Sequence, residues 1–262
     1  MVKKILVLAT LLLFAGLIGG AFTIKGKLDQ HDSIEKKVDM TDIQQIEITT
    51  VNGKVNLHPI DENEATIEYV GNLSEYELIE EVEDNTLRIL VKSKGLRFFS
   101  IDLLTFSQSI NVAVPERLYD SITVNTNNGR IDVDNLQVNH LDTKTDNGRI
   151  SLRNVATETS NVRSSNGRII LEHVAGEINA HTSNGKILLE SESLDQSIDL
   201  STNNGAIEIL TENRPTNVAI DANTDNGRIR VYGETDWDIV TGNGDNLIKL
   251  TTDNGSITIS DK

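Results

Sequence analysis

An Asn-Gly dipeptide recurs eight times in this chain within one and the same pattern of residues. From Gly129 to Gly205 the steps between successive glycines are 19, 19, 18 and 20 residues. A repeat of this length is typical of chains that stack one small unit on the next. The eight glycines are Gly53, Gly129, Gly148, Gly167, Gly185, Gly205, Gly227 and Gly255.

The residues around each Asn-Gly alternate between apolar and polar. A Thr or Ser always stands two residues before the Asn, and a Val or Ile always stands three residues after it. Alternation of this kind indicates two short strands, half-buried on one face, on either side of a corner. We expect each corner glycine to adopt a positive φ angle. The Val and Ile positions are Val55, Ile131, Ile150, Ile169, Ile187, Ile207, Ile229 and Ile257.

Two all-β architectures use such a unit. Asn-Gly between alternating strands is also a hairpin signal, which would give a meander or a sandwich. The same residue type at the same offset in every unit favours a β-solenoid of about eight Asn-Gly-cornered coils. The coils would lie about 4.8 Å apart, with a column of Ile inside and a column of Asn along one edge.

The repeat is interrupted once, between residues 61 and 118. We expect this insertion to cap the N-terminal end of the solenoid, within one body that spans residues 42–262. The coil cornered at Gly255 would then form the C-terminal end, so that Ile257 lies in the terminal coil.

The N-terminal part of the chain predicts export of the body. Residues 5–22 carry no charge and follow Lys3 and Lys4, which favours an N-inside, single-pass transmembrane helix within residues 1–25. A linker over residues 26–41 would connect it to an extracytoplasmic body. The alternative is a signal peptide cleaved near Gly19-Gly20-Ala21, which would release the body as a secreted protein.

Composition excludes several kinds of function. The formal net charge is −16 and the chain contains no cysteine. An acidic body is repelled by phosphate backbones, so we expect no nucleic-acid partner. Without cysteine there is no disulfide, thiolate metal site or cysteine nucleophile, and the five histidines show no metal-ligand spacing. We therefore expect no catalytic residue, no metal and no cofactor.

Four consecutive units place a basic residue directly after the corner glycine. In a solenoid they would form a column of like charge, which is unfavourable unless something opposes it. The side chains would either spread into water, or bind an anionic wall polymer or an envelope protein. We call these four residues the basic column: Arg130, Arg149, Arg168 and Lys186.

A second candidate binding segment lies inside the insertion, at residues 96–106. It contains Phe98, Phe99 and Phe106, the only phenylalanines outside the N-terminal apolar segment. One interpretation is that it covers the open end of the solenoid. The other is an apolar patch that docks onto a membrane protein or the outer leaflet.

The repeated SNGxI, TDNGxI and TNNGxI units, the segment INVAVPERL at 110–118 and GNG at 242–244 resemble the putative adhesin family. This is a bacterial domain of unknown function that includes the LiaG-like membrane-anchored envelope proteins. The resemblance covers roughly residues 40–262. It implies a β-solenoid body and an association with envelope stress, and it implies no enzyme activity and no agreed site residues.

The sequence therefore predicts a non-enzymatic, membrane-anchored protein whose solenoid presents a binding surface, in envelope stress or surface interaction. One alternative is an enzyme that cleaves wall glycans. Asp199 and Asp221 share one outward offset in consecutive units, and side by side they would lie near the separation used by retaining glycosidases. The other alternative is a structural adhesin.

Overall fold

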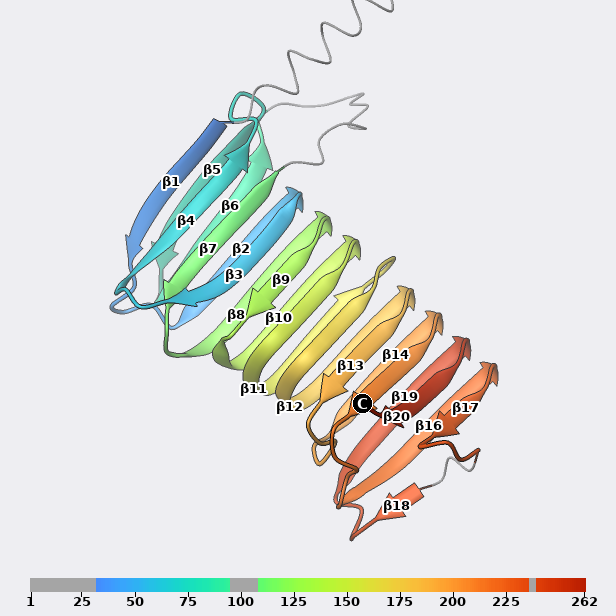
Figure 1. Cartoon of the computed structure of the whole chain (residues 1–262). Helices are drawn as coiled ribbons and strands as arrows, with labels where there is room; N and C mark the ends of the chain where they lie inside the picture. The colour runs from blue at the N-terminus through green and yellow to red at the C-terminus, as the bar shows by residue number, and fades with distance from the viewer. Residues whose placement is uncertain (1–31, 95–107, 236–238) are drawn as a thin grey trace, which may run out of the picture.

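The computed structural model describes residues 32–94, 108–235 and 239–262, and these residues form strands and turns without a helix (Figure 1). The strands of the N-terminal half are β1 (Asp32–Asp39), β2 (Gln45–Asn52), β3 (Lys54–Ile60), β4 (Glu64–Gly71), β5 (Tyr76–Glu83), β6 (Thr86–Ser93), β7 (Ser109–Pro115), β8 (Leu118–Asn128), β9 (Ile131–Asp134) and β10 (Gln137–Asn147). Those of the C-terminal half are β11 (Ile150–Ser164), β12 (Ile169–Asn184), β13 (Ile187–Ser191), β14 (Ile198–Asn204), β15 (Ile207–Thr211), β16 (Val218–Asn226), β17 (Ile229–Val231), β18 (Ile239–Thr241), β19 (Asn246–Asn254) and β20 (Ile257–Asp261).

Each of the eight repeated Asn-Gly dipeptides forms a corner between two strands of one coil, and the coils stack in register. Ile131 pairs with Ile150, Ile150 with Ile169, and Ile169 with Ile187, always between parallel strands. The side chains of these four isoleucines are fully buried. The all-β, solenoid-like architecture expected from the repeat is thus confirmed, with a continuous apolar core between the two strands of every coil.

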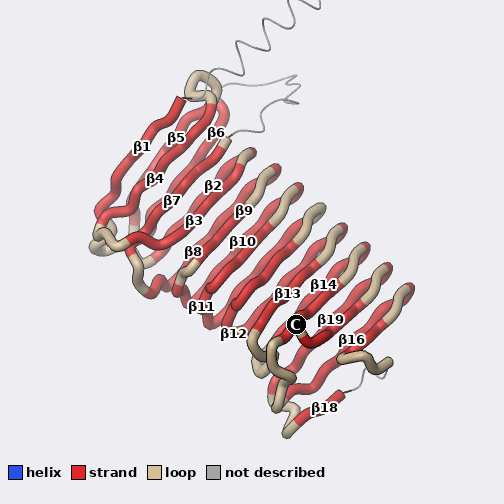
Figure 2. The backbone as a smooth tube through the Cα atoms, viewed as in Figure 1, coloured by secondary structure: helices blue, strands red, loops and turns tan. Residues whose placement is uncertain are grey.

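The corner asparagines form a hydrogen-bonded ladder along one edge of the stack, where the turns line up in Figure 2. Asn147 Nδ2 donates to Asn128 Oδ1 at 2.8 Å, and Asn166 Nδ2 donates to Asn147 Oδ1 at 3.0 Å. The same bond links every neighbouring pair from Asn52 to Asn226. The column of Asn predicted for this edge is confirmed.

The corner glycines allow the coils to approach each other closely. A Cβ built on Gly167 would lie 1.6 Å from the carbonyl oxygen of Gly148 in the neighbouring coil. Of the eight corner glycines only Gly53 has a positive φ, at 104°. The expected positive φ is therefore wrong for the other seven corners, where glycine is needed because a side chain would collide with the next coil's backbone.

In six of the eight Asn-Gly units the Thr or Ser before the corner ties one coil to the next. Thr182 Oγ1 donates to the carbonyl oxygen of Gly167 at 3.0 Å, and Thr202 Oγ1 donates to that of Gly185 at 3.1 Å. Both hydroxyls are buried. The hydroxyl thus satisfies a backbone acceptor of the neighbouring coil, which explains the restriction of this position to Thr and Ser.

The opposite edge of the stack contains a second corner, which lacks the Asn-Gly dipeptide. Asn135, Asn154 and His173 have φ angles of 57°, 51° and 54° at equivalent places in three successive coils. Asn154 Nδ2 donates to Asn135 Oδ1 at 2.9 Å. Here the positive φ that was expected at Asn-Gly is found at residues without a following glycine.

The order of the coils differs from the order of the sequence at the C-terminal end. β19 lies between β14 and β16, and β20 lies between β15 and β17. The coil cornered at Gly255 is therefore internal, and the coil cornered at Gly227 is terminal. The expectation that Ile257 lies in the terminal coil is wrong, since Ile257 is fully buried while Ile229 is only partly buried.

The N-terminal end is covered by strands of the 61–118 segment. β6 pairs with β2 and β7 pairs with β3, both in parallel, so that β6 and β7 continue the two rows of strands. β5 then pairs antiparallel with β6, and β4 antiparallel with β7.

The linker expected over residues 26–41 is contradicted at residues 32–39. Residues Asp32–Asp39 form β1, which pairs antiparallel with β4 at the outermost position of the stack. Ile34 and Val38 pack against the core, and Lys36 forms an ion pair with Glu80. The segment is a strand because its alternate side chains complete the apolar end of the stack. The expected anchor at 1–25 lies outside the described residues, and no helix in the described part is long and apolar enough to cross a membrane.

Candidate functional site

The structure brings the basic column together on the outer surface, one residue beyond the Asn-Gly corners. The amide of Ile131 donates to the carbonyl of Arg149 at 2.9 Å, and the amide of Ile150 to that of Arg168 at 3.0 Å. The amide of Ile169 donates to the carbonyl of Lys186 at 3.0 Å. The four backbone positions therefore stand in adjacent coils, about 4.8 Å apart.

Lys54 extends the column by one coil. The amide of Val55 donates to the carbonyl of Arg130 at 2.8 Å, which sets Lys54 beside Arg130. The 61–118 segment separates the two residues in the chain, and this separation hid the relation. The signal was nevertheless present, because Lys54 follows its corner glycine just as Arg130 follows Gly129.

Charge pairing divides the extended column into a centre and two ends. Lys54 Nζ lies 2.9 Å from Asp132 Oδ2, and Lys186 forms an ion pair with Glu208. Among residues 32–94, 108–235 and 239–262, no carboxylate lies within ion-pair distance of the three central arginines. Arg130 and Arg168 are exposed and Arg149 is half-buried. Unpaired positive charge is thus concentrated over about 10 Å of an otherwise acidic protein.

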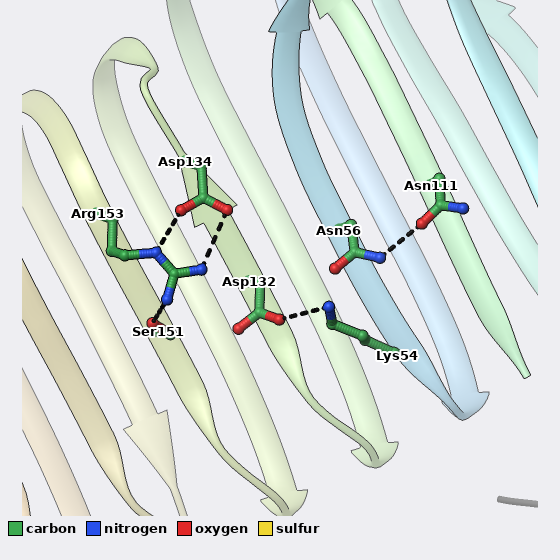
Figure 3. A network of polar contacts seen from close by, with 7 residues as sticks. All are labelled: Lys54, Asn56, Asn111, Asp132, Asp134, Ser151 and Arg153. Carbon is green, nitrogen blue, oxygen red and sulfur yellow. Dashed lines mark hydrogen bonds and ion pairs between the residues drawn. The ribbon is translucent and has the colours of Figure 1, made fainter. Parts of the chain in front are cut away.

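The polar side chains beside the column are held by one another (Figure 3). Arg153 Nε donates to Asp134 Oδ1 at 2.7 Å, and a terminal nitrogen of Arg153 donates to Ser151 Oγ at 3.0 Å. The hydrogen bond to Asp134 raises the pKa of Arg153. Asp132 is 5% exposed and faces Lys54. This network fixes the surface next to the column and leaves the three central arginines as its available cations.

The carboxylate pair considered for catalysis is not formed. Lys249 pairs with Asp199 on one side and with Asp221 on the other, because the Gly255 coil is inserted between their coils. Lys249 Nζ lies 3.9 Å from Asp199 Oδ2. A lysine thus separates the two carboxylates that were expected to be neighbours, and the pairing assumed for the glycan-cleaving alternative is wrong.

Other predicted features fall outside this surface. Phe98, Phe99 and Phe106 lie outside the described residues. Within the described ranges no group of three or more His, Asp or Glu side chains is placed to hold a metal ion.

Comparison with known proteins identifies one family. The model of that family, described as Toastrack DUF4097, matches residues 43–159 and 129–260. No curated protein matches the chain.

Two solved structures resemble the whole body weakly. A putative cell adhesion protein from Clostridium sporogenes is 16% identical, with a TM-score of 0.47, over 89% of this chain and 100% of that chain. A putative adhesin from Bacteroides fragilis is 15% identical, with a TM-score of 0.48, over 88% of this chain and 97% of that chain. Likeness at this level carries no argument about a site.

Proposed function

The chain belongs to the Toastrack DUF4097 family, and on this premise we propose that it is a non-enzymatic envelope protein whose basic column binds an anionic wall polymer. The proposal rests on one observation, the unpaired charge of Arg130, Arg149 and Arg168 in adjacent coils. Each of the two flanking lysines has a carboxylate partner and these arginines have none among the described residues.

The energetics of the column favour an external anion. Like charges on neighbouring strands destabilise a sheet. The formal net charge of the chain is −16, so acidic side chains that could have faced these arginines are plentiful. A polymer with repeated anionic groups, laid along the stack axis, would meet three guanidinium groups at once. Guanidinium forms two parallel hydrogen bonds to phosphate or carboxylate, so the contact would be charge-assisted and specific in geometry.

The cellular setting is part of the same proposal. The uncharged segment 5–22 would act as a single-pass anchor with the body outside the cell membrane, in envelope stress or surface interaction. A cleaved signal peptide would release the same body. With the anchor retained, the β1 end of the stack would lie nearest the membrane, because β1 begins ten residues after the apolar segment.

The test is retention of the protein by purified anionic wall polymer. Changing Arg149 and Arg168 together to Gln should abolish retention without lowering the melting temperature, because neither arginine has a partner to lose and the change relieves repulsion between like charges. In the wild type, retention should weaken as salt screens the charges, with a screening length of about 10 Å at 0.1 M salt.

Arg163→Gln together with Arg214→Gln is the matched control. It removes the same charge from residues paired with Asp142 and Asp261, away from the column. Equal loss of retention in both double variants would show only a general charge effect and would contradict the proposal. Release of soluble glycan fragments during the incubation would instead support an enzyme.

A further inference from the structure

The terminal coil, formed by β16 and β17 around Gly227, exposes groups that every other Asn-Gly coil covers. The Thr or Ser two residues before the Asn is buried in the other seven coils, and Thr224 is half-buried. The Val or Ile two residues after the glycine is fully buried in the other seven, and Ile229 is partly buried. Gly227 is itself exposed, while the other corner glycines are half-buried.

The outer edge of this coil is only partly paired. β18 covers Val218, Ala219 and Ile220 of β16 in antiparallel register. Beyond these, residues 221–226 have no strand on their outer side within the described part of the chain. β17 has a single outer bridge, from Val231 to Glu234. An open edge of this kind presents backbone groups that can pair with an added strand.

At this edge of the described structure, the Asn side chain and the glycine carbonyl lack the hydrogen bonds that a next coil would supply. Asn226 Nδ2 donates to Asn254 Oδ1 at 3.1 Å, and among the described residues no donor reaches Asn226 Oδ1. Thr224 Oγ1 donates to the carbonyl of Gly255 at 3.0 Å, and no described hydroxyl donates to the carbonyl of Gly227. The acceptors that a further coil would use are therefore in place.

We propose that the Gly227 edge binds, by parallel strand addition, an extended segment of another protein that carries Ser/Thr-x-Asn-Gly. The occupant needs glycine at the corner, because a Cβ at the seven stacked glycines would lie 1.6–2.0 Å from the next carbonyl oxygen. It needs a hydroxyl two residues before the Asn, to donate to the Gly227 carbonyl. The eight repeated Asn-Gly units of this chain already stand in its own stack, and Thr241-Gly242-Asn243-Gly244 forms the turn between β18 and β19, so the segment comes from a different molecule.

Charge further defines the partner. Asp221 is exposed on the outer surface five residues before Asn226, and its existing neighbour at that offset is Lys249. Arg228 and Arg230 are exposed after the corner. The segment should therefore carry a basic residue five positions before its Asn and favour an acidic residue just after its glycine.

The probe is a fluorescent peptide with the sequence of residues 246–260, which contains Lys249, Thr252, Asn254 and Gly255. We expect saturable binding to the full-length protein in detergent micelles, measured by fluorescence anisotropy. The same peptide with Gly255→Val should bind about tenfold more weakly or worse, since the added side chain would meet the Gly227 carbonyl.

The place of binding is tested with a bulky adduct. The chain has no cysteine, so Asn223→Cys and Lys144→Cys each create one site for a polyethylene glycol maleimide. Both residues are exposed and lie three positions before a corner Asn, in the terminal coil and in an internal coil. The adduct at 223 should abolish peptide binding, and the adduct at 144 should leave it unchanged.

Three results would overturn the proposal. One is no binding of the unmodified peptide to the full-length protein. Another is equal binding in the presence of the adduct at 223. The third is exchange, in which the peptide replaces residues 246–262 in the interior of the stack and these residues lose their protection from hydrogen exchange. Failure of polymer retention by the basic column would leave the proposal unaffected, because the two surfaces share no residue.

Discussion

Gly167 lies against Gly148 of the neighbouring coil, and the space between them admits no side chain. A Cβ on Gly167 would lie 1.6 Å from the Gly148 carbonyl oxygen. Because the φ angle is not positive here, the restriction is steric and does not depend on torsion. We expect Gly167→Ala and Gly167→Asn to destabilise the protein alike, by about 1–3 kcal/mol or more, measured by denaturant unfolding.

Gly233 provides the control for this prediction. Its φ is 89° and an added Cβ there would meet nothing within 4 Å. Asn tolerates the left-handed region better than Ala does, so Gly233→Asn should cost less than Gly233→Ala. The same preference for Asn at position 167 would mean that its torsion angle limits the choice of residue.

The sequence could indicate a corner at each Asn-Gly and could not say which property of glycine the corner uses. Asn-Gly indicates a turn in both cases, whether glycine is needed for its positive φ angle or for its missing Cβ atom. The opposite corners were not recognised because Asn135, Asn154 and His173 share a conformation without sharing a residue type. Their positive φ angles follow from the path that the chain takes at the second corner of each coil, and this path is defined only in the stacked structure.

At the scale of elements, the coils are chemically alike and the sequence therefore does not fix their order. The units at Gly205, Gly227 and Gly255 have the same Thr, Asn, Gly and Ile at the same offsets, so each could stack on either of the others. Charge offers a physical reason for the observed order. Sequential stacking would place Asp199 beside Asp221, and the inserted strand β19 places Lys249 between them instead.

The inserted coil makes a testable difference in core energetics. Ile169 and Ile257 are both fully buried, and we expect Ile169→Ala and Ile257→Ala to cost similar amounts, about 2–5 kcal/mol. Ile229→Ala should cost clearly less, since Ile229 stands in the terminal coil and is partly buried. Equilibrium unfolding of the three variants measures this order. A smaller cost at 257 than at 229 would place the Gly255 coil at the end of the stack.

The candidate site was predictable to the extent that its residues follow the repeat. Arg130, Arg149, Arg168 and Lys186 share one offset in consecutive units, and the stacked coils place them as a column. The sequence could not predict which of these basic residues form ion pairs and which do not. Lys186 forms an ion pair with Glu208 of the next coil, and Lys54 forms an ion pair with Asp132 of the coil beside it. Such pairings depend on register between strands far apart in the chain.

At the scale of the whole molecule, the stability of this acidic protein should depend on pH through a few carboxylates. Hydrogen bonds from the side chain and amide of Thr41 lower the pKa of Asp39, and the hydrogen bond from Arg214 lowers that of Asp261. Burial by itself would raise the pKa of Asp195, but hydrogen bonds from the amides of Asn217 and Thr216 outweigh it and lower the pKa.

Asp195 joins two loops, because its Oδ1 accepts the amide of Thr216 at 2.8 Å and that of Asn217 at 2.9 Å. A carboxylate whose pKa is lower in the folded state contributes stability above its ordinary value of 3.8 and loses it as pH falls through the folded pKa. The melting temperature of Asp195→Ala should therefore lie below that of the wild type at pH 7. This difference should shrink as the pH is lowered from about 4 toward 2, since protonation removes from the wild type the interaction that the variant already lacks. Scanning calorimetry of both proteins over this range measures it, and a difference that stays constant would show that Asp195 acts through packing rather than through its charge.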